Sequence, residues 1–181
     1  MELRLVGSEM CIRDRIMPDN VYLGNPNLKK ANTAIEFTQE QILEFMRCKE
    51  DPVYFANKYI KIVSLDEGLT QFHPYHFQEK LINNFHENRF NICKMPRQTG
   101  KSTTVVSYLL HYAVFNDSVN IGILANKAAT ARELLGRLQT AYENLPKWMQ
   151  QGIIAWNKGS LELENGSKIL AASTSASAVR G

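Results

Sequence analysis

The sequence lacks several features that would assign it quickly to a class of protein. Its 181 residues include only three cysteines, Cys11, Cys48 and Cys93, and no two of them form a C-x-x-C pair. A disulfide framework and a zinc ribbon are therefore poor explanations, and a reducing cytoplasm fits best. No apolar run has the length of a membrane span, and no signal peptide with an apolar centre opens the chain. We expect a soluble, intracellular protein with no membrane partner.

A strong charge of one sign is also missing. The formal net charge is +3 and the sequence pI is about 8.7. Dedicated nucleic-acid-binding modules usually show a stronger bias or a concentrated basic face, so charge alone does not indicate DNA. The four histidines include a pair at i, i+3 spacing near a helix start, but Cys93 is the only thiol close to them in sequence, and we expect packing or surface roles for each. Hydrophobic residues make up 44% of the chain, which suits one domain with a buried core.

The first residues do not fit the rest of the chain. Residues 6–15 (VGSEMCIRDR) resemble adapter sequence translated at the end of assembled reads. A natural disordered terminus is the alternative. We treat residues 1–20 as a disordered or non-native leader and exclude them from the fold.

Residues 21–87 are predicted to form a small helical N-terminal subdomain. Thr38 and Gln41 form a capping box at the start of one helix, and Asp51-Pro52 starts a second. A third helix follows Pro74, after a short strand from Lys61 to Leu65. Apolar residues at helical spacing are expected to face the core. They are Ile42, Leu43, Phe45 and Met46 in the first helix, and Tyr75, Phe77, Leu81, Ile82 and Phe85 in the third.

Residues 88–181 alternate between strand and helix patterns. A short apolar strand over residues 90–93 precedes a loop, and a mostly apolar helix runs from Ser102 to Phe115. A second strand from Val119 to Ala125 and a long helix that Pro146 stops complete the repeat. This order is typical of an α/β domain with a parallel sheet. Asn165-Gly166 then predicts a hairpin between two further strands.

The loop before the apolar helix has the composition of a phosphate-binding site. Such a site requires converging backbone N–H groups, a flexible cation and a hydroxyl for Mg²⁺. Gly100, Lys101 and Ser102 occupy these positions in residues 95–102 (MPRQTGKS), although Met95 replaces the first glycine of the general G-x-x-x-x-G-K-[ST] pattern. The alternative is a chance tripeptide in which Ser102 only caps the helix. Its place between a strand and an apolar helix favours binding of a nucleoside triphosphate, above all ATP.

Residues 95–103 (MPRQTGKST) resemble the deviant Walker A motif of large terminase subunits, the DNA-packaging ATPases of tailed phages. In that family an Arg-Gln pair replaces the early glycine region, so Met95 is no longer an objection. The similarity extends from about Tyr22 to Gly181 and is closest to the T-even type. It is carried by residues 25–32 (NPNLKKAN), 53–56 (VYFA), 122–125 (GILA) and 156–160 (WNKGS), which are specific together and weak singly.

The resemblance implies a RecA-like P-loop NTPase, with a parallel sheet and flanking helices, of which residues 88–181 form the first half. It implies ATP and Mg²⁺ as cofactors, with Ser102 as the metal ligand. Catalytic roles fall to Lys101, to Arg97 as an arginine finger in cis, and to Arg180 as a finger in trans. Solvent or sheet-edge contact remains the alternative for Arg97, and DNA phosphate or solvent for Arg180. The implied nucleotide-binding residues are Gln78, Pro96, Arg97, Gln98, Thr99, Gly100, Lys101, Ser102 and Thr103.

Gln78 is the residue expected to read the adenine base. The family places a glutamine on a helix ahead of the Walker strand, and Phe77-Gln78 occupies the matching place. A glutamine amide offers a donor and an acceptor together, which match the N6 and N7 edge of adenine. A surface glutamine on an amphipathic helix is the alternative.

The function implied by the resemblance is that of a motor that hydrolyses ATP to translocate double-stranded DNA into a viral procapsid. It would act in the host bacterial cytoplasm as a homo-oligomeric ring, with a portal protein and a small terminase subunit as partners. The implied Walker B aspartate and catalytic glutamate would follow residue 181, so we expect the isolated chain to hydrolyse ATP negligibly. Two other classes remain open, a superfamily-two helicase and a nucleotide-binding scaffold without catalysis.

Overall fold

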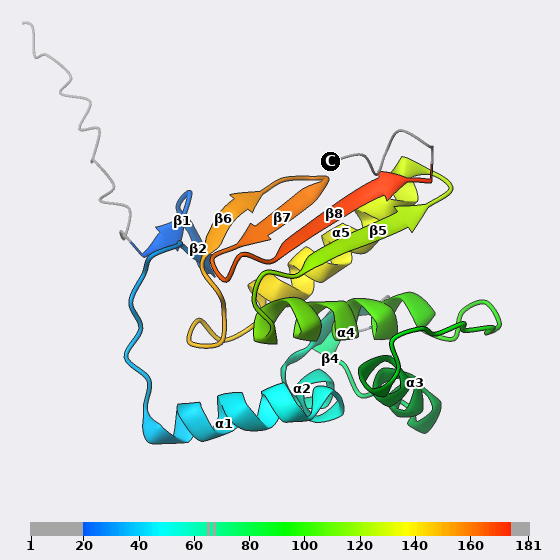
Figure 1. The fold of residues 1–181 in the computed structure, drawn as a ribbon, viewed down its shortest axis with the longest axis horizontal. Coiled ribbons are helices and arrows are strands. Elements are labelled where there is room, and N and C mark those ends of the chain that lie inside the picture. Colours follow the sequence, from blue (N-terminus) through cyan, green and yellow to red (C-terminus); the bar gives the residue numbers. More distant parts are fainter. Residues whose placement is uncertain (1–19, 65, 67, 175–181) are drawn as a thin grey trace, which may run out of the picture.

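A computed structural model describes residues 20–64, 66 and 68–174, and these residues form three layers (Figure 1). A four-stranded sheet is the first layer. The helices α4 (Lys101–Phe115) and α5 (Ala128–Glu143) pack against each other, and α5 also covers β5 and β8 of the sheet. A group of shorter helices packs on the far side of α4. The order of the layers places α4 in the middle of the molecule.

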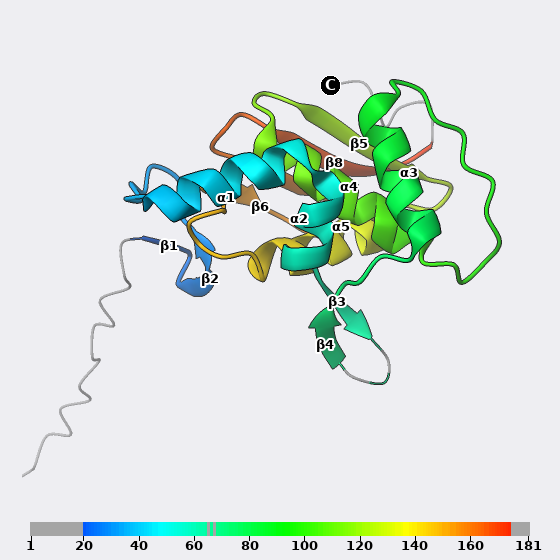
Figure 2. The same cartoon turned by 90° about the horizontal axis from the view of Figure 1, so that it is seen from below.

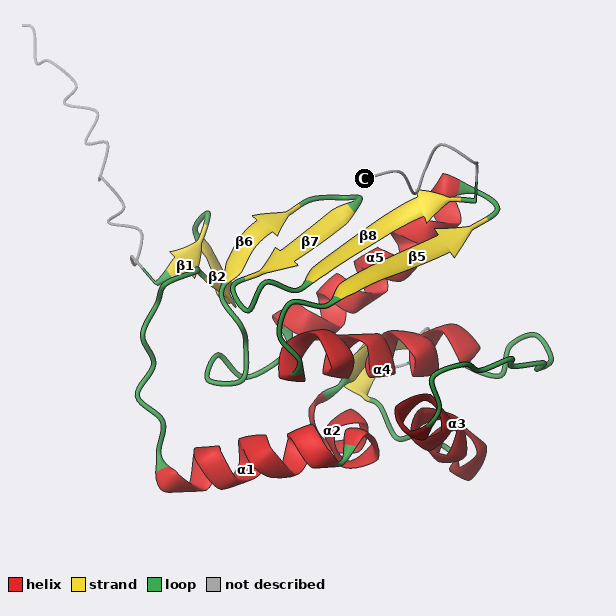
Figure 3. Ribbon diagram, viewed as in Figure 1, coloured by secondary structure: helices red, strands yellow, loops and turns green. Residues whose placement is uncertain are grey.

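The sheet is mixed, not parallel throughout. Its strand order is β5 (Asn120–Ala125), β8 (Lys168–Ser173), β7 (Ser160–Leu163), β6 (Ile153–Trp156), as the yellow strands of Figure 3 show. Only β5 and β8 run parallel, with Ile121 opposite Ile169. The expectation of a parallel sheet was wrong for β6 and β7, because tight connections reverse the chain there. The predicted hairpin at Asn165-Gly166 joins β7 to β8, and Gly166 adopts φ 80°, where glycine carries no steric cost.

The core lies between the sheet and the helices. Leu161 and Leu163 of β7 and Ile169 of β8 are buried, in the alternating pattern of strands with one face on the core. One face of α5 is buried as well, and it includes Leu135 and Leu138. Large side chains that are almost completely buried include Leu110, Leu135, Leu138, Tyr142, Ile153, Leu161 and Leu163.

Three helices make the outer layer: α1 (Gln39–Glu50), α2 (Pro52–Tyr59) and α3 (His76–Glu87). Both predicted caps are confirmed. The Thr38 hydroxyl accepts a hydrogen bond from the Gln41 backbone N–H, and the Asp51 carboxylate accepts one from the Tyr54 backbone N–H. A hairpin of β3 (Lys61–Ser64) and β4 (Gly68–Gln71) projects between α2 and α3 (Figure 2).

The predicted core faces of α1 and α3 are only partly correct. On α1, Ile42, Leu43 and Met46 are exposed, and Leu43 retains 69% of its accessible surface. Phe45 packs on Phe115 of α4, and Cys48 is fully buried, so only this side of α1 has a partner. Helical spacing shows which residues share a face, but a face is buried only where another element lies against it. On α3, Leu81 and Ile82 are buried as expected, whereas Tyr75 and Phe77 are exposed.

A short hairpin at the start of the described chain packs beside the sheet. It consists of β1 (Val21–Tyr22) and β2 (Asn25–Lys29). The buried Gln150 side chain holds it, because its amide accepts from the Lys29 N–H and donates to the Asn27 carbonyl. Within the described residues, no helix is both long and apolar enough to span a bilayer.

The strand predicted over residues 90–93 is absent. Phe90 and Ile92 are 83% and 101% exposed, and residues 88–96 form an extended connection with no strand pairing in the described part of the chain. A β-strand needs a neighbour for its N–H and C=O groups, and residues 90–93 do not pair with β5, the edge strand of the described sheet. The α/β class is confirmed, while the RecA-like P-loop fold stays a prediction.

Candidate nucleotide-binding site

The candidate site is the loop that leads into α4. Gln98 and Gly100 both adopt left-handed backbone conformations, with φ values of 62° and 71°. Gly100 is the N-cap residue of α4. Left-handed geometry is readily available to glycine but uncommon for glutamine, so the loop is held in a conformation that its sequence alone would not favour.

The first turn of α4 is suited to an anion. The Thr104 N–H donates to the Gly100 carbonyl, whereas the N–H groups of Lys101, Ser102 and Thr103 have no partner among the described residues. Unpaired N–H groups and the positive end of the helix dipole together favour negative charge. The first turn carries no acidic side chain that would oppose a phosphate.

The side chain of Lys101 lies within the loop. Its Nζ donates to the carbonyls of Met95 and Pro96 at 3.1 and 2.5 Å. The Thr99 hydroxyl also donates to the Pro96 carbonyl, at 3.1 Å. The ammonium group is thus already beside the helix start, bound to neutral carbonyls that phosphate oxygens, as stronger acceptors, can displace.

Gln78 reaches the same loop from α3. Its side chain is buried, with 3% of its surface exposed. The amide oxygen accepts a hydrogen bond from the Tyr75 N–H at 2.9 Å, and the amide nitrogen donates to the Thr99 carbonyl at 3.3 Å. The structure therefore brings Gln78 and the phosphate loop together, although 21 residues separate Gln78 from Thr99. Adenine contact by this amide stays a prediction.

The other proposed site residues differ in their surroundings. Pro96, Arg97, Gln98 and Ser102 are exposed, and Arg97 makes no ion pair with any described residue. Thr103 is half-buried and lines a cavity of about 710 Å³ between β3, α4 and α5. Arg180 lies outside the described residues, so its position relative to the loop stays open.

The residues present fit a nucleotide with Mg²⁺. Among the described residues, no group of three or more histidines, cysteines and carboxylates gathers that could hold a metal by itself. Mg²⁺ at phosphate sites commonly needs only one or two protein ligands beside water and phosphate oxygens. The exposed Ser102 hydroxyl in the first turn of α4 is suited to that role.

Sequence reasoning missed one connection of this site, the bond between Gln78 and the loop backbone. No pattern in the sequence signals it, because it depends on how α3 packs on α4. That packing is visible in the Tyr108 hydroxyl, which donates to the Phe85 carbonyl at 3.0 Å, and in the Phe85 and Tyr108 rings, 5.5 Å apart.

Comparison with solved structures first defines the class of fold. The chain resembles the crystal structure of the large terminase of bacteriophage HK97, with a TM-score of 0.59 and 18% sequence identity. The match covers 74% of this chain and 29% of that terminase, so this chain spans less than a third of its length. At this identity the likeness establishes the arrangement of helices and strands.

The sequence supplies the particular family. Residues 92–181, which include the loop and α4, match the model of the N-terminal part of T4likevirus-type terminase large subunits. The chain belongs to the large terminase subunits, the DNA-packaging proteins of bacteriophages. This agrees with the resemblance drawn from residues 95–103 and favours it over a superfamily-two helicase.

Proposed function

We propose that the loop of residues 95–103 binds the phosphates of ATP, and that the chain is the nucleotide-binding part of a motor that packages double-stranded DNA. The observation that carries the proposal is the start of α4, where unpaired N–H groups, the Lys101 ammonium and the Ser102 hydroxyl adjoin the left-handed Gly100. Large terminase subunits are in general ATPases, which supports ATP as the ligand.

Each residue has a defined task in this proposal. Lys101 moves from the loop carbonyls to the outer phosphates, and Ser102 binds Mg²⁺. Arg97, exposed beside the loop, neutralises charge that develops on the γ-phosphate. The backbone from Pro96 to Thr103 surrounds the phosphates, and Gln78 is the candidate contact for the adenine edge. Arg180 would serve the nucleotide of a neighbouring subunit.

The wider assignment follows from the family. The complete protein would couple ATP hydrolysis to translocation of double-stranded DNA into the procapsid. It would form a ring of identical subunits and engage a portal protein and a small terminase subunit in the cytoplasm of the host bacterium. The competing function is a scaffold that binds a nucleotide without hydrolysing it. The ATPase rate of the complete protein distinguishes the two functions.

Binding of a fluorescent ATP analogue with Mg²⁺ tests the site. Lys101→Ala should weaken binding about ten- to a hundredfold, because it removes charge-assisted hydrogen bonds to phosphate. Lys127→Ala is a matched control: Lys127 is an exposed lysine at the N-cap of α5, away from the loop in sequence. Equal affinities for the wild-type chain and Lys101→Ala would refute the assignment.

A further inference from the structure

We propose that Gln78 is a positioning residue for the phosphate loop: its amide holds the Thr99 carbonyl and thereby fixes the loop for the phosphates, whichever base the nucleotide carries. This inference rests on the proposed function of the loop. It differs from the reading of Gln78 as an adenine contact, because it assigns the residue a role toward phosphate.

The first support is that the hydrogen-bonding groups of the amide are already in use. The oxygen of Gln78 accepts from the Tyr75 N–H, and its nitrogen donates to the Thr99 carbonyl. One N–H of the amide and one lone pair of its oxygen remain for any other partner. The side chain is 3% exposed, so the group that a base would have to reach is buried against the loop.

The second support is how closely the amide approaches the loop. A Cβ atom added at Gly100 would lie 2.5 Å from the Gln78 nitrogen, nearer than such atoms can come. Gln78 therefore packs on Gly100 while it bonds Thr99. A side chain at position 100 would therefore displace the Gln78 amide from the loop, in addition to the strain at the φ of 71°.

The third support is that the conformation of the loop needs a stabilising contact from outside the loop. Thr99 lies between Gln98 and Gly100, both with left-handed φ angles. A glutamine in this region is held by its surroundings, because the conformation is disfavoured for a residue with a side chain. Within the loop, Lys101 and the Thr99 hydroxyl bond the carbonyls of residues 95 and 96. The bond from Gln78 is the side-chain contact among the described residues that holds the Thr99 carbonyl.

The helix α3, which carries Gln78, is itself held in place by packing. Leu81 and Ile82 bury one side of α3, and Phe85 packs on Tyr108 of α4. The loop is thus tied at one end to α4, into which it continues, and at Thr99 to α3, which packs on the same helix. Both views of the chain show α3 beside α4 (Figures 1 and 2). A change at Gln78 should then alter the geometry of every phosphate contact.

Inorganic triphosphate separates the two roles because it has no base. We would measure the affinity of the 181-residue chain for Mg²⁺-triphosphate and for a Mg²⁺-ATP analogue by isothermal titration. Gln78→Met keeps the length of the side chain without a hydrogen bond, and Gln78→Glu keeps the acceptor for Tyr75 but loses the donor to Thr99. Each variant should bind both ligands about fivefold more weakly, as expected for loss of the hydrogen bond to the Thr99 carbonyl, which both variants lack.

Gln41→Met is the matched control. Gln41 has the same place in α1, where its side-chain oxygen accepts from the Thr38 N–H at 3.1 Å, but it does not touch the loop. It should lower the unfolding midpoint as Gln78→Met does and leave triphosphate affinity unchanged. Equal losses in Gln41→Met and Gln78→Met would show an effect of stability alone and overturn the proposal.

The remaining outcomes are also decisive. Loss of affinity for the ATP analogue only would make Gln78 a base reader and overturn the positioning role. Weakening in Gln78→Glu without weakening in Gln78→Met would be an effect of the added charge, and would overturn it too. If Lys101→Ala abolishes triphosphate binding while both Gln78 variants bind normally, the phosphate site stands and only this inference fails. If the wild-type chain does not bind triphosphate, the proposed function fails with it.

Discussion

His111 lies in the C-terminal half of α4, and its surroundings keep the imidazole neutral. Burial lowers the pKa of His111 to about 4, against the opposing effect of the hydrogen bond to the Cys48 carbonyl at 2.8 Å. A carbonyl only accepts, so Nε2 carries the proton, and Nδ1 has no partner among the described residues. The sequence predicted a packing or surface role for each histidine, and for His111 it is packing. The ring links α1 to the helix that begins at the phosphate loop.

Because of His111, the free energy of unfolding should fall in mild acid. The pKa is near 6.5 in the unfolded chain and about 4 in the folded chain, so between these values the unfolded state binds more protons. The contribution is fully present above about pH 6.5 and is lost as the pH falls toward 4. From about pH 7 to pH 5 the free energy of unfolding should drop by roughly 2 kcal/mol. Urea denaturation at the two pH values measures this drop in the free energy of unfolding.

His111→Phe is the comparison variant, because it keeps an aromatic ring among Phe55 and Phe115 but cannot take up a proton. Its stability should change little between the two pH values, even if it is lower at pH 7. An undiminished pH dependence in His111→Phe would assign the effect to another group.

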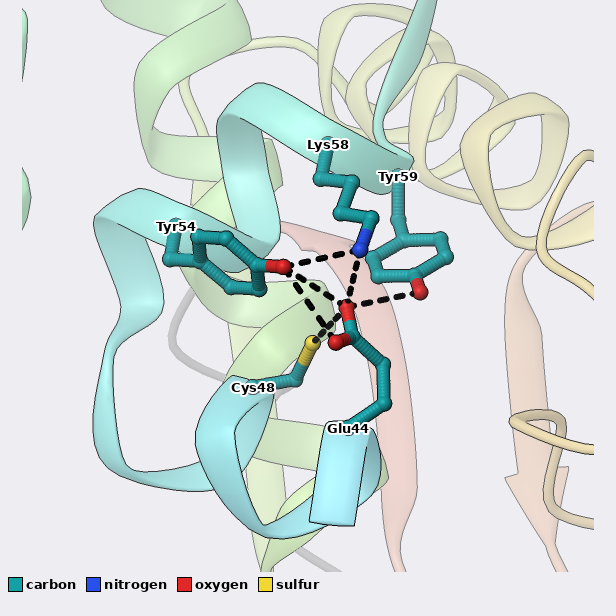
Figure 4. Close-up of polar contacts among 5 residues, drawn as sticks. All are labelled: Glu44, Cys48, Tyr54, Lys58 and Tyr59. Carbon is teal, nitrogen blue, oxygen red and sulfur yellow. Dashed lines mark hydrogen bonds and ion pairs between the residues drawn. The ribbon is translucent and has the colours of Figure 1, made fainter. Parts of the chain in front are cut away.

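At the scale of elements, one carboxylate joins α1 to α2 (Figure 4). Glu44 of α1 accepts hydrogen bonds from the hydroxyls of Tyr54 and Tyr59 and from the Lys58 ammonium, at 2.9, 2.8 and 2.7 Å. Burial alone would raise the pKa of Glu44, but these hydrogen bonds outweigh it and the pKa is lowered. Burial also raises the pKa of the neighbouring Cys48 thiol to about 12, so this cysteine stays protonated and unreactive.

Glu44→Gln should loosen α1 from α2. The amide has no charge to hold Lys58 and the two hydroxyls, and unfolding at neutral pH should become easier by roughly 1–2 kcal/mol. Because the folded pKa is depressed, the contribution of Glu44 is present above its ordinary value of 4.5 and is lost as the pH falls below it. The difference between wild type and Glu44→Gln should therefore shrink in that acid range, in thermal unfolding followed by circular dichroism.

Glu40→Gln serves as the control, since Glu40 is an exposed acid in the first turn of the same helix. Glu40→Gln should lower the free energy of unfolding by less than about 0.5 kcal/mol. If both variants unfold alike, the cluster around Glu44 contributes nothing measurable to the helix pair.

At the scale of the whole molecule, the described part leaves one side of the sheet uncovered. Leu124 of β5, Leu170 of β8 and Ile154 of β6 are about half exposed, and each follows a buried residue, Ile123, Ile169 or Ile153, on the opposite face of its strand. The segment before the phosphate loop is extended and pairs with no strand in the part of the chain that the structure describes. The related HK97 terminase is a much longer chain, of which this one spans 29%.

Assembly of the complete protein provides the test for Arg180. A finger in trans predicts that Arg180→Ala still binds ATP but loses hydrolysis stimulated by ring formation. Mixing it with Lys101→Ala subunits should restore part of the ATPase rate, because each variant supplies what the other lacks. If the mixture stays inactive and Arg180→Ala instead weakens DNA binding with a smaller salt dependence, the arginine contacts DNA phosphate.

The sequence predicted the local parts of this structure well. The caps at Thr38 and Asp51, the helix after Lys101 and the hairpin at Asn165-Gly166 depend on residues close together in the chain. The family likewise followed from a run of nine residues, because the identities at positions 95–103 are unusual. These features could be predicted since their causes lie within a few residues of their effects.

What only the tertiary structure decided depends on distant partners. The apolar spacing of residues 90–93 is that of a strand, but no strand lies beside it in the described residues. The stripe of Ile42, Leu43 and Met46 is helical, but no element among the described residues covers it. Gln78 has the donor and acceptor groups of a residue that contacts a base, yet the packing of α3 on α4 places its amide in a hydrogen bond with the Thr99 carbonyl. Hydrogen bonding and burial each require a second group, and the sequence near a residue does not say where that group will be.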